Sequence, residues 1–289
     1  MVAVRDLAGR IAFITGAGGG VGAGIARALA ARGAQLALAD LQPGLLERRR
    51  VEFDEAGVRV ATYALDVTEP EAIERVAADV EATFGPVSIC VNNAGVGYVG
   101  APADQVPARD YDWVFAVNVL GVIHGVRAFV PRMRARRSGH VVNVASIDGL
   151  LPEPALHHAP YCASKAAVIA FSGALRNDLQ GTGIGVTVVC PGLVKSQLPA
   201  SSQLRPQRFG GAYERPGADA FSADMASRGI SADAAGRIIV AAIRDGQFLA
   251  FTHADSRQRV HAHFQAEIES AFAWSEAVLA GIGKTQAGS

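Results

Sequence analysis

The chain has 289 residues, half of them hydrophobic, and its 27 Lys and Arg residues balance 27 Asp and Glu residues, so the formal net charge is zero. This length and apolar content predict one α/β domain with a large buried core. A neutral chain lacks the basic surface that nucleic-acid binding requires, and we find no apolar stretch of the roughly 18–20 residues that a membrane span needs. We therefore expect neither a nucleic-acid nor a membrane partner.

The first ten residues lack the pattern of a secretory signal peptide, so we expect a cytoplasmic protein. The three cysteines lack the spacing of a disulfide framework or of a metal site. Two of them, Cys90 and Cys190, lie in apolar runs and are typical of buried free thiols in a reducing compartment.

Short apolar or β-branched runs alternate along the chain with longer segments of helical periodicity. Continuously apolar strands separated by helices are typical of parallel strands that are covered on both faces. We therefore predict a single domain, residues 1–289, with a Rossmann-type, doubly wound, parallel seven-stranded sheet and helices on both faces. The predicted strands occupy residues 10–15, 34–40, 59–66, 87–95, 139–146, 183–192 and 246–251, and clear helical patterns cover residues 21–33 and 70–85.

Two segments fall outside this alternation. Residues 193–230 are rich in Ser, Pro, Arg and Gly, and we predict that they form an insertion that acts as a substrate loop. Long irregular excursions in such folds often act as lids over a site. Residues 252–289 are predicted to form a C-terminal helical extension.

The first predicted strand runs into the glycine-rich turn TGAGGGVG, residues 15–22. Gly16, Gly20 and Gly22 permit a tight turn and a close approach of the backbone, and Val21 begins a helix whose free N–H groups can bind a pyrophosphate. Such a turn also occurs for purely structural reasons. Its position after the first strand, with an acidic residue at the end of the second, favours a dinucleotide site.

Asp40 ends the second predicted strand, where a carboxylate can accept hydrogen bonds from both ribose hydroxyls and repel a 2′-phosphate. Residues 16–22 contain no Arg or Lys, and Leu41 follows Asp40, so a counter-charge for that phosphate is missing. We therefore predict NAD rather than NADP as the cofactor. Other strand ends add polar or small residues to the predicted trough, although each could be an ordinary turn: Asp66, Val67, Asn92, Ala94 and Gly95.

Several short motifs occur in order and at suitable spacings: the glycine turn, NNAG at residues 92–95, Asn118, Ser146, Tyr161-x-x-x-Lys165 and Pro191–Gly192. As a set they resemble the short-chain dehydrogenases/reductases over residues 8–195. The resemblance implies a nicotinamide-dependent oxidoreductase, and a homodimer or homotetramer built through helices like 104–136 and 160–181. It implies Asn118, Ser146, Tyr161 and Lys165 as the catalytic residues, and Tyr161, Lys165, Pro191, Gly192, Val194 and Ser196 as cofactor contacts.

Tyr161 and Lys165 are four residues apart in an expected helix, so their side chains leave the same face. A neighbouring ammonium and a positive nicotinamide ring are expected to lower the pKa of the phenol. Tyr161 could then take the proton of an alcohol while hydride passes to the cofactor, with Ser146 bonded to the substrate oxygen. An ordinary pair on an amphipathic helix is the alternative, and Ser146 at the end of the preceding strand disfavours it.

Asn118 lies in the middle of an expected helix, where asparagine is disfavoured. A hydrogen bond from its side chain back to its own helix is one explanation. The resemblance implies instead a helix kink that holds a water molecule between Lys165 and solvent.

Tyr161 lies fifteen positions after Ser146, slightly more than is usual in the family, and the intervening LLPEPALHHA (150–159) is predicted to bulge into the substrate mouth. His157 and His158 are either substrate contacts there or an exposed histidine pair. Patches within 193–272 resemble a bacterial branch of the family that oxidises the benzylic secondary alcohols of lignin-derived aryl ethers. The predicted substrate contacts are Ser146, Leu151, His158, Tyr161, Leu193 and Leu198, in an apolar mouth with Val96, Tyr98 and Leu150.

We therefore predict an NAD-dependent dehydrogenase that interconverts a bulky or aromatic secondary alcohol and its ketone, with Tyr161 as general base and acid. A hydroxysteroid, a terpene alcohol or a 3-hydroxyacyl group would fit the same mouth. A catalytically silent NAD-binding protein, a Rossmann-type methyltransferase and a flavoprotein are alternatives that leave the catalytic set unexplained. His261 and His263 lie on different faces of an expected helix, so we predict no metal site.

Overall fold

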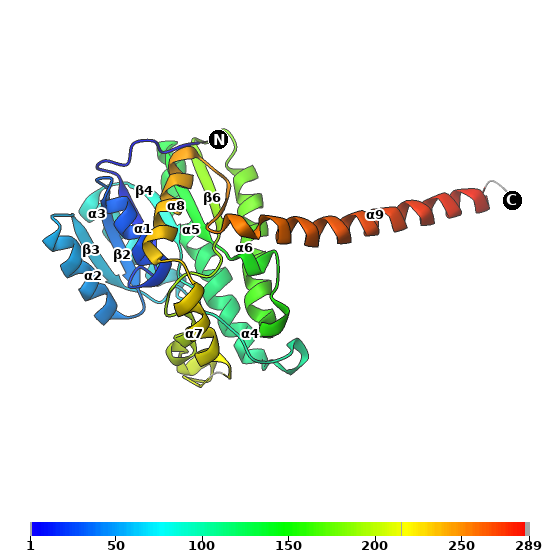
Figure 1. The fold of residues 1–289 in the computed structure, drawn as a ribbon. Helices are drawn as coiled ribbons and strands as arrows, with labels where there is room; N and C mark the ends of the chain where they lie inside the picture. Colours follow the sequence, from blue (N-terminus) through cyan, green and yellow to red (C-terminus); the bar gives the residue numbers. More distant parts are fainter. Residues whose placement is uncertain (1, 215, 287–289) are drawn as a thin grey trace. The chain divides into compact units, whose positions relative to one another are not determined.

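The computed structural model describes residues 2–214 and 216–286. Its centre is a seven-stranded parallel sheet in the order β3-β2-β1-β4-β5-β6-β7, with helices around it (Figure 1). The strands are β1 (Ile11–Thr15), β2 (Gln35–Asp40), β3 (Val60–Ala64), β4 (Val87–Asn92), β5 (Gly139–Val144), β6 (Ile184–Cys190) and β7 (Leu249–Phe251). The predicted Rossmann-type, doubly wound sheet is confirmed.

The strand order changes direction at β1. From β1 the chain runs outward through β2 to β3, and it then returns to the other side of β1 with β4 and continues to β7. In a sheet of this kind, the connections after β1 and β4 lead away to opposite faces, which opens a crevice at the carboxyl ends of the strands. The topology therefore places a ligand site where the glycine-rich turn leaves β1.

Alternate residues of each strand pack on different helices, so the sheet is buried on both faces. Ala12 and Ile14 of β1 belong to one core cluster, whereas Ile11 and Phe13 belong to the other. The first cluster lies under α1 (Gly20–Ala30), α2 (Pro43–Glu55) and α8 (Ala232–Asp245). The second lies under α3 (Pro70–Phe84), α5 (Gly121–Arg136) and α6 (Ala159–Asp178).

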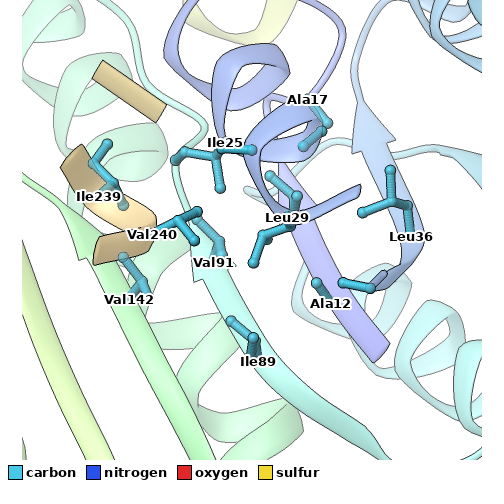
Figure 2. Close-up of a cluster of buried hydrophobic side chains, with 14 of the residues drawn as sticks. Ala12, Ala17, Ile25, Leu29, Leu36, Ile89, Val91, Val142, Ile239 and Val240 are labelled. Atoms are coloured by element: carbon cyan, nitrogen blue, oxygen red, sulfur yellow. The ribbon is translucent and has the colours of Figure 1, made fainter. Parts of the chain in front are cut away.

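Figure 2 shows the first cluster, in which Ile25 and Leu29 of α1 and Ile239 and Val240 of α8 gather over strand residues such as Val91. All five side chains are completely buried. Burying a side chain of this size stabilises the fold by roughly 1.5–3 kcal/mol. This packing holds α1, and with it the turn that precedes α1, firmly against the sheet.

One long helix packs on the face of the sheet that carries the second core cluster. α4 (Ala108–Phe115), a π-helical turn (Ala116–Leu120) and α5 are continuous, and an 18-residue window has a mean hydropathy of 1.7. By length and composition alone this helix could cross a membrane, so our expectation that no stretch is apolar enough was wrong. Of that window 56% is buried, and Phe129 and Met133 pack in the second cluster, as in the core helix of a folded domain.

The predicted substrate-loop segment, residues 193–230, follows β6 and is more regular than its composition suggests. It contains the short 3₁₀ turns Leu198–Leu204 and Gln207–Phe209 and then helix α7 (Ala218–Arg228), which the sequence pattern did not predict. A β-bridge between Val194 and Ile230 brings the two ends of the segment together.

Contacts divide the chain into two compact units, the first ending at Thr252 and the second beginning at His253. The second unit contains α9 (Arg257–Gln286), on which Phe272, Trp274 and Leu279 are exposed. α9 falls within the C-terminal helical extension predicted for 252–289, of which residues 287–289 lie outside the described part of the chain.

Candidate active site

A cavity of about 240 Å³ opens at the carboxyl ends of the strands. Most of the residues predicted to bind a cofactor or a substrate line this cavity. They are Gly16, Gly20, Val21, Asp40, Leu41, Asp66, Val67, Ala94, Gly95, Ser146, Tyr161, Lys165, Pro191, Gly192, Val194, Ser196 and Leu198. Six predicted site residues are not among its lining: Gly22, Asn92, Asn118, Leu151, His158 and Leu193.

The glycine-rich turn after β1 has the backbone that a dinucleotide site needs. Gly16 and Gly20 have φ angles of 63° and 50°, in the left-handed region that favours glycine. A Cβ on Gly22 would lie 2.2 Å from the carbonyl oxygen of Gly16, so Gly22 closes the turn from behind. α1 begins at Gly20 without a side-chain cap, which leaves its first N–H groups available to an anion.

Asp40 stands beside this turn at the end of β2. Its carboxylate accepts hydrogen bonds from the backbone N–H groups of Gly18, at 2.9 Å, and Gln42, at 3.0 Å. Among the described residues that line the cavity, Lys165 is the only Lys or Arg. A 2′-phosphate near Asp40 would therefore meet a negative charge without a compensating lining cation.

Asp66 lines the same end of the cavity, one strand further out. It accepts hydrogen bonds from the Thr68 backbone N–H at 2.9 Å, from the Thr68 hydroxyl at 2.7 Å and from Arg208 at 2.9 Å. Although burial opposes it, these hydrogen bonds and the charge of Arg208 lower the pKa of the carboxyl. Arg208 comes from the 193–230 segment, so that segment reaches the predicted adenine end.

The Asn92 prediction needs correction, because the side chain of Asn92 points into the protein interior. Asn92 is 2% exposed, and its amide donates a hydrogen bond to Asn143 Oδ1 at 2.9 Å. Its neighbour Asn93 lines the cavity instead and donates to the carbonyl oxygens of Thr15, at 2.9 Å, and Gly16, at 3.1 Å. Asn93 therefore fixes the glycine-rich turn against the end of β4.

Tyr161 and Lys165 lie on the cavity face of α6, one turn apart, as predicted from their spacing. Lys165 Nζ donates a hydrogen bond to the Val144 carbonyl at 2.9 Å and lies 5.7 Å from the centre of the Tyr161 ring. Burial lowers the pKa of Lys165 to about 8. Burial, with the charge of Asp148, raises the pKa of Tyr161. The depression of the phenol pKa that we expected depends on the ammonium and the nicotinamide ring together, and it stays a prediction.

Ser146 follows β5 and lies within hydrogen-bonding reach of Tyr161, an interaction that favours the phenolate. Its own hydroxyl is held by the next turn of the chain. The Asp148 backbone N–H donates to Ser146 Oγ at 3.2 Å, and the hydroxyl lies 3.4 Å from the Asp148 carboxylate. Two acceptors, Asp148 and Tyr161, thus share the single proton of Ser146.

Asn118 sits in the π-helical turn between α4 and α5 and is completely buried. Its amide accepts from the Val96 N–H at 2.8 Å and donates to the Val96 carbonyl at 2.9 Å and to Ser164 Oγ at 3.0 Å. The side chain is therefore bonded to the loop after β4 rather than to its own helix, and the alternative of a back-bond is wrong. A Cβ on Gly95 would lie within 3.4 Å of both Asn118 Oδ1 and Lys165 Nζ, so these two groups are close neighbours.

The apolar end of the cavity includes residues that the sequence pattern did not single out. Trp113 and Val117 line it from the helix that carries Asn118, and Ser201 lines it from the 193–230 segment, beside the predicted contact Leu198. Ser201 Oγ accepts a hydrogen bond from the Gly97 N–H at 3.0 Å, which joins that segment to the loop after β4. The four-residue spacing of Trp113 and Val117, just ahead of Asn118, was the available signal that they share its inward face.

The prediction that residues 150–159 form the substrate mouth is wrong. None of residues 147–160 lines the cavity, and the segment instead forms a 3₁₀ turn, Pro154–Leu156. His157 is exposed, whereas His158 is 5% exposed, so these two residues are neither an exposed pair nor cavity-lining contacts. Within the part of the chain that the structure describes, no group of three His, Cys, Asp or Glu side chains could hold a metal ion.

Comparison with known sequences identifies the relatives of this chain. A profile for short chain dehydrogenases matches residues 10–206. A C alpha-dehydrogenase from Sphingobium sp. strain NBRC 103272 / SYK-6 is 34% identical over 271 residues, which is 92% of this chain and 88% of that protein. A 1-deoxy-11-beta-hydroxypentalenate dehydrogenase from Streptomyces exfoliatus is 33% identical over 88% of this chain and 87% of its own length.

Solved structures agree with these relatives. A short chain dehydrogenase/reductase from Burkholderia phymatum in complex with NAD superposes with a TM-score of 0.86 at 32% identity, covering 92% of this chain and 97% of that one. The apo form of LigD from Sphingobium sp. strain SYK-6 gives a TM-score of 0.76 at 31% identity, over 92% and 98% of the two chains. Sequence, fold and relatives together establish that this chain belongs to the short-chain dehydrogenase/reductase family of oxidoreductases.

Proposed function

We propose that the protein is an NAD-dependent dehydrogenase that interconverts a bulky, benzylic secondary alcohol and the corresponding ketone. The observation that carries this proposal is that Ser146, Tyr161 and Lys165 line the same cavity as the dinucleotide-type turn. A catalytically silent nucleotide-binding protein would need the turn and Asp40, but it would have no use for a buried phenol beside a buried lysine.

The chain fits a nicotinamide dinucleotide at the polar end of the cavity. The uncapped N–H groups at the start of α1 suit a pyrophosphate, and the positive φ at Gly16 and Gly20 lets the backbone approach it closely. Asp40 is suited to the hydroxyls of an unphosphorylated ribose. When bound, the oxidised cofactor supplies a hydride acceptor and a positive charge.

The residues at the other end perform the proton chemistry. In alcohol oxidation, Tyr161 Oη accepts the proton of the substrate hydroxyl, and in ketone reduction it returns that proton to the carbonyl oxygen. Ser146 holds the substrate oxygen by a hydrogen bond. Lys165, as an ammonium, favours the phenolate through its charge, and the Asn118 amide supports these residues by joining the loop after β4 to Ser164.

The apolar end of the cavity supports a bulky substrate. Val96, Trp113, Val117 and Leu198 line it, and they offer apolar and aromatic surface beside Tyr161. The similarity to a C alpha-dehydrogenase favours an aryl alcohol, and the similarity to a hydroxypentalenate dehydrogenase makes a terpenoid alcohol the second candidate.

A screen of initial rates with NAD+ tests this assignment. We expect 1-phenylethanol and larger 1-aryl alcohols to be oxidised with a higher kcat/KM than steroid, terpene or 3-hydroxyacyl secondary alcohols, because the apolar wall pairs an indole with branched aliphatic side chains. Chiral analysis of the residual alcohol gives the stereochemistry from the same reactions. NADH binding without turnover of any alcohol in the panel would instead support the silent nucleotide-binding protein.

The cofactor preference is expected to depend on the charge at the end of β2. Leu41→Arg combined with Asp40→Asn should lower the ratio of kcat/KM for NAD+ to that for NADP+ by about 10–100-fold, because it removes a repulsive carboxylate and adds a cation for the 2′-phosphate. Steady-state rates with both cofactors give the ratio. An unchanged ratio in the double variant contradicts the ribose role of Asp40.

Asp40→Asn alone removes the repulsive carboxylate without adding a cation, so it separates the effects of these two changes on the cofactor ratio. Asparagine retains an oxygen that can accept the Gly18 N–H, so the glycine-rich turn keeps one of its supports. Glu47→Gln is the matched control, since Glu47 is an exposed carboxylate of α2 that pairs with Arg50 away from the lining, and it should leave the ratio as it is.

Family members act on small molecules and typically assemble into oligomers. We propose a homodimer or homotetramer that pairs the outer faces of α5 and α6. Leu120, at the start of α5, is a large apolar side chain that is 47% exposed, and a subunit interface there would bury it. Leu120→Glu is expected to shift the mass measured by size exclusion with light scattering toward the monomer.

A further inference from the structure

Two ionisable side chains lie behind the catalytic residues without lining the cavity. Asp148 belongs to the turn after Ser146, and His158 caps the start of α6, three residues before Tyr161. His158 is 5% exposed, and its Nε2 atom is buried without a hydrogen-bond partner. A buried, unpartnered imidazole nitrogen is costly, so its position calls for an explanation beyond packing.

The geometry connects these two side chains to both catalytic hydroxyls. His158 Nε2 lies 3.9 Å from Asp148 Oδ2, and the same carboxylate oxygen lies 3.4 Å from Ser146 Oγ. The His158 ring is stacked against Tyr161, with 6.4 Å between ring centres and 24° between ring planes. The Asp148 carboxylate therefore lies between the His158 imidazole and Ser146, and the imidazole also lies against the Tyr161 ring.

The carboxylate of Asp148 works against the proposed general base. Burial is the largest cause that raises the pKa of Tyr161, and the negative charge of Asp148 is the second largest. The Asp148 carboxylate oxygen also competes with the phenol for the Ser146 proton. The other groups around Tyr161 are Lys165 and two thiols. Burial raises the pKa of both Cys162 and Cys190 to about 12, so these thiols are neutral near neutral pH.

We propose that Asp148 and His158 form a positioning pair for Ser146 and Tyr161. The carboxylate holds the Ser146 hydroxyl in place from behind, and the His158 ring, whose Nε2 atom faces the same carboxylate, holds that carboxylate in position beside the phenol. The pair acts through the two catalytic hydroxyls and touches neither substrate nor cofactor. This inference rests on the proposed function, because it assigns Tyr161 the role of base.

Opposite shifts in two isosteric or near-isosteric variants test the pair. Asp148→Asn removes the charge that opposes ionisation, so the rising limb of kcat/KM against pH for NAD+-dependent oxidation of 1-phenylethanol should move down by about one pH unit. His158→Gln removes the ring that holds the carboxylate in position, so the carboxylate charge acts more strongly on the phenol and the limb should move up by a similar amount. A purely structural role would change the height of both profiles without moving them in opposite directions.

A second measurement needs no substrate. Tyrosinate absorbance of the NAD+-loaded protein, titrated against pH and corrected by the Tyr161→Phe variant, reports the ionisation of Tyr161 alone. The same pair of opposite shifts is expected there. His157→Asn is the matched control, because it removes the neighbouring exposed imidazole, and asparagine tolerates the φ of 45° at that position.

Two results would overturn the pair. The first is a shift of the same sign in Asp148→Asn and His158→Gln, and the second is an unshifted profile in folded variants with normal NADH affinity. Either result would show that Asp148 and His158 do not tune the ionisation of Tyr161, while the proposed function would stand. Failure of the proposed function looks different, since Tyr161→Phe would then retain turnover whatever Asp148 and His158 do.

Discussion

Tyr161→Phe is expected to lower kcat by about 10³-fold or more while leaving NADH affinity within a few-fold. The hydroxyl of Tyr161 is the only part of the side chain that this change removes, and the ring that packs in the apolar cluster beside the cavity is retained. Proton transfer therefore fails, while the residues predicted to bind the dinucleotide stay intact. Steady-state rates with the best alcohol of the screen, and NADH binding followed by fluorescence, separate the two effects.

Tyr63→Phe serves as the matched control. Tyr63 lies in β3, away from the cavity lining, and burial with a hydrogen bond to Asp79 raises its pKa to about 12. Loss of this phenol should leave kcat close to that of the native protein. Substantial activity in Tyr161→Phe, or an equal loss in Tyr63→Phe, contradicts the assignment of Tyr161 as general acid and base.

Features that depend on local spacing could be predicted from the sequence. A glycine-rich turn between a strand and a helix, an acidic residue at the next strand end and a Tyr–Lys pair one helical turn apart each follow from a few neighbouring residues. Strands that are almost continuously apolar, such as β1 and β6, also report burial on both faces directly. These signals were enough to predict the parallel sheet, the family, and Tyr161 and Lys165 as cavity residues.

Features that depend on packing between distant segments could not be predicted. The choice between Asn92 and Asn93 depends on the exact end of β4 and on Gly125, where a Cβ would lie 1.9 Å from Asn92 Oδ1. Residues 150–159 carry the Pro and His composition of an exposed loop, but His158 turns inward because Asp148 and Tyr161 lie beside it. No periodicity in the sequence encodes such contacts.

The contact between α4 and the 193–230 segment is the strongest example, because Asp110 and Arg205 are 95 residues apart and form an ion pair that is almost completely buried. Arg205 also donates from Nε to the Gly211 carbonyl at 2.7 Å and stacks over the ring of Tyr213 at 3.9 Å. The guanidinium thus organises the turn that follows the cavity-lining residue Leu198 and fastens it to α4.

Arg205→Met is therefore expected to lower the free energy of unfolding by about 3–5 kcal/mol, because it leaves the Asp110 carboxylate buried without a partner. Equilibrium unfolding in urea measures the change. Such a loss is a large part of the stability of a typical domain. Arg208→Met is the control: Arg208 is 46% exposed, and its ion pairs with Asp66 and Glu69 should contribute less than about 1 kcal/mol.

The double variant Asp110→Leu/Arg205→Met distinguishes the cost of an unpaired charge from the loss of packing. Replacing both partners removes the buried charge, so most of the lost stability should return. The native geometry of the 193–230 segment should not be restored, because the ion pair that fastens it to α4 is still missing. KM for the alcohol is then expected to stay raised while kcat with Tyr161 intact changes little, since Leu198 and Ser201 shape the apolar end but take no part in proton transfer. A double variant as unstable as Arg205→Met would mean that guanidinium packing on Tyr213, rather than the buried charge pair, holds the substrate segment on α4.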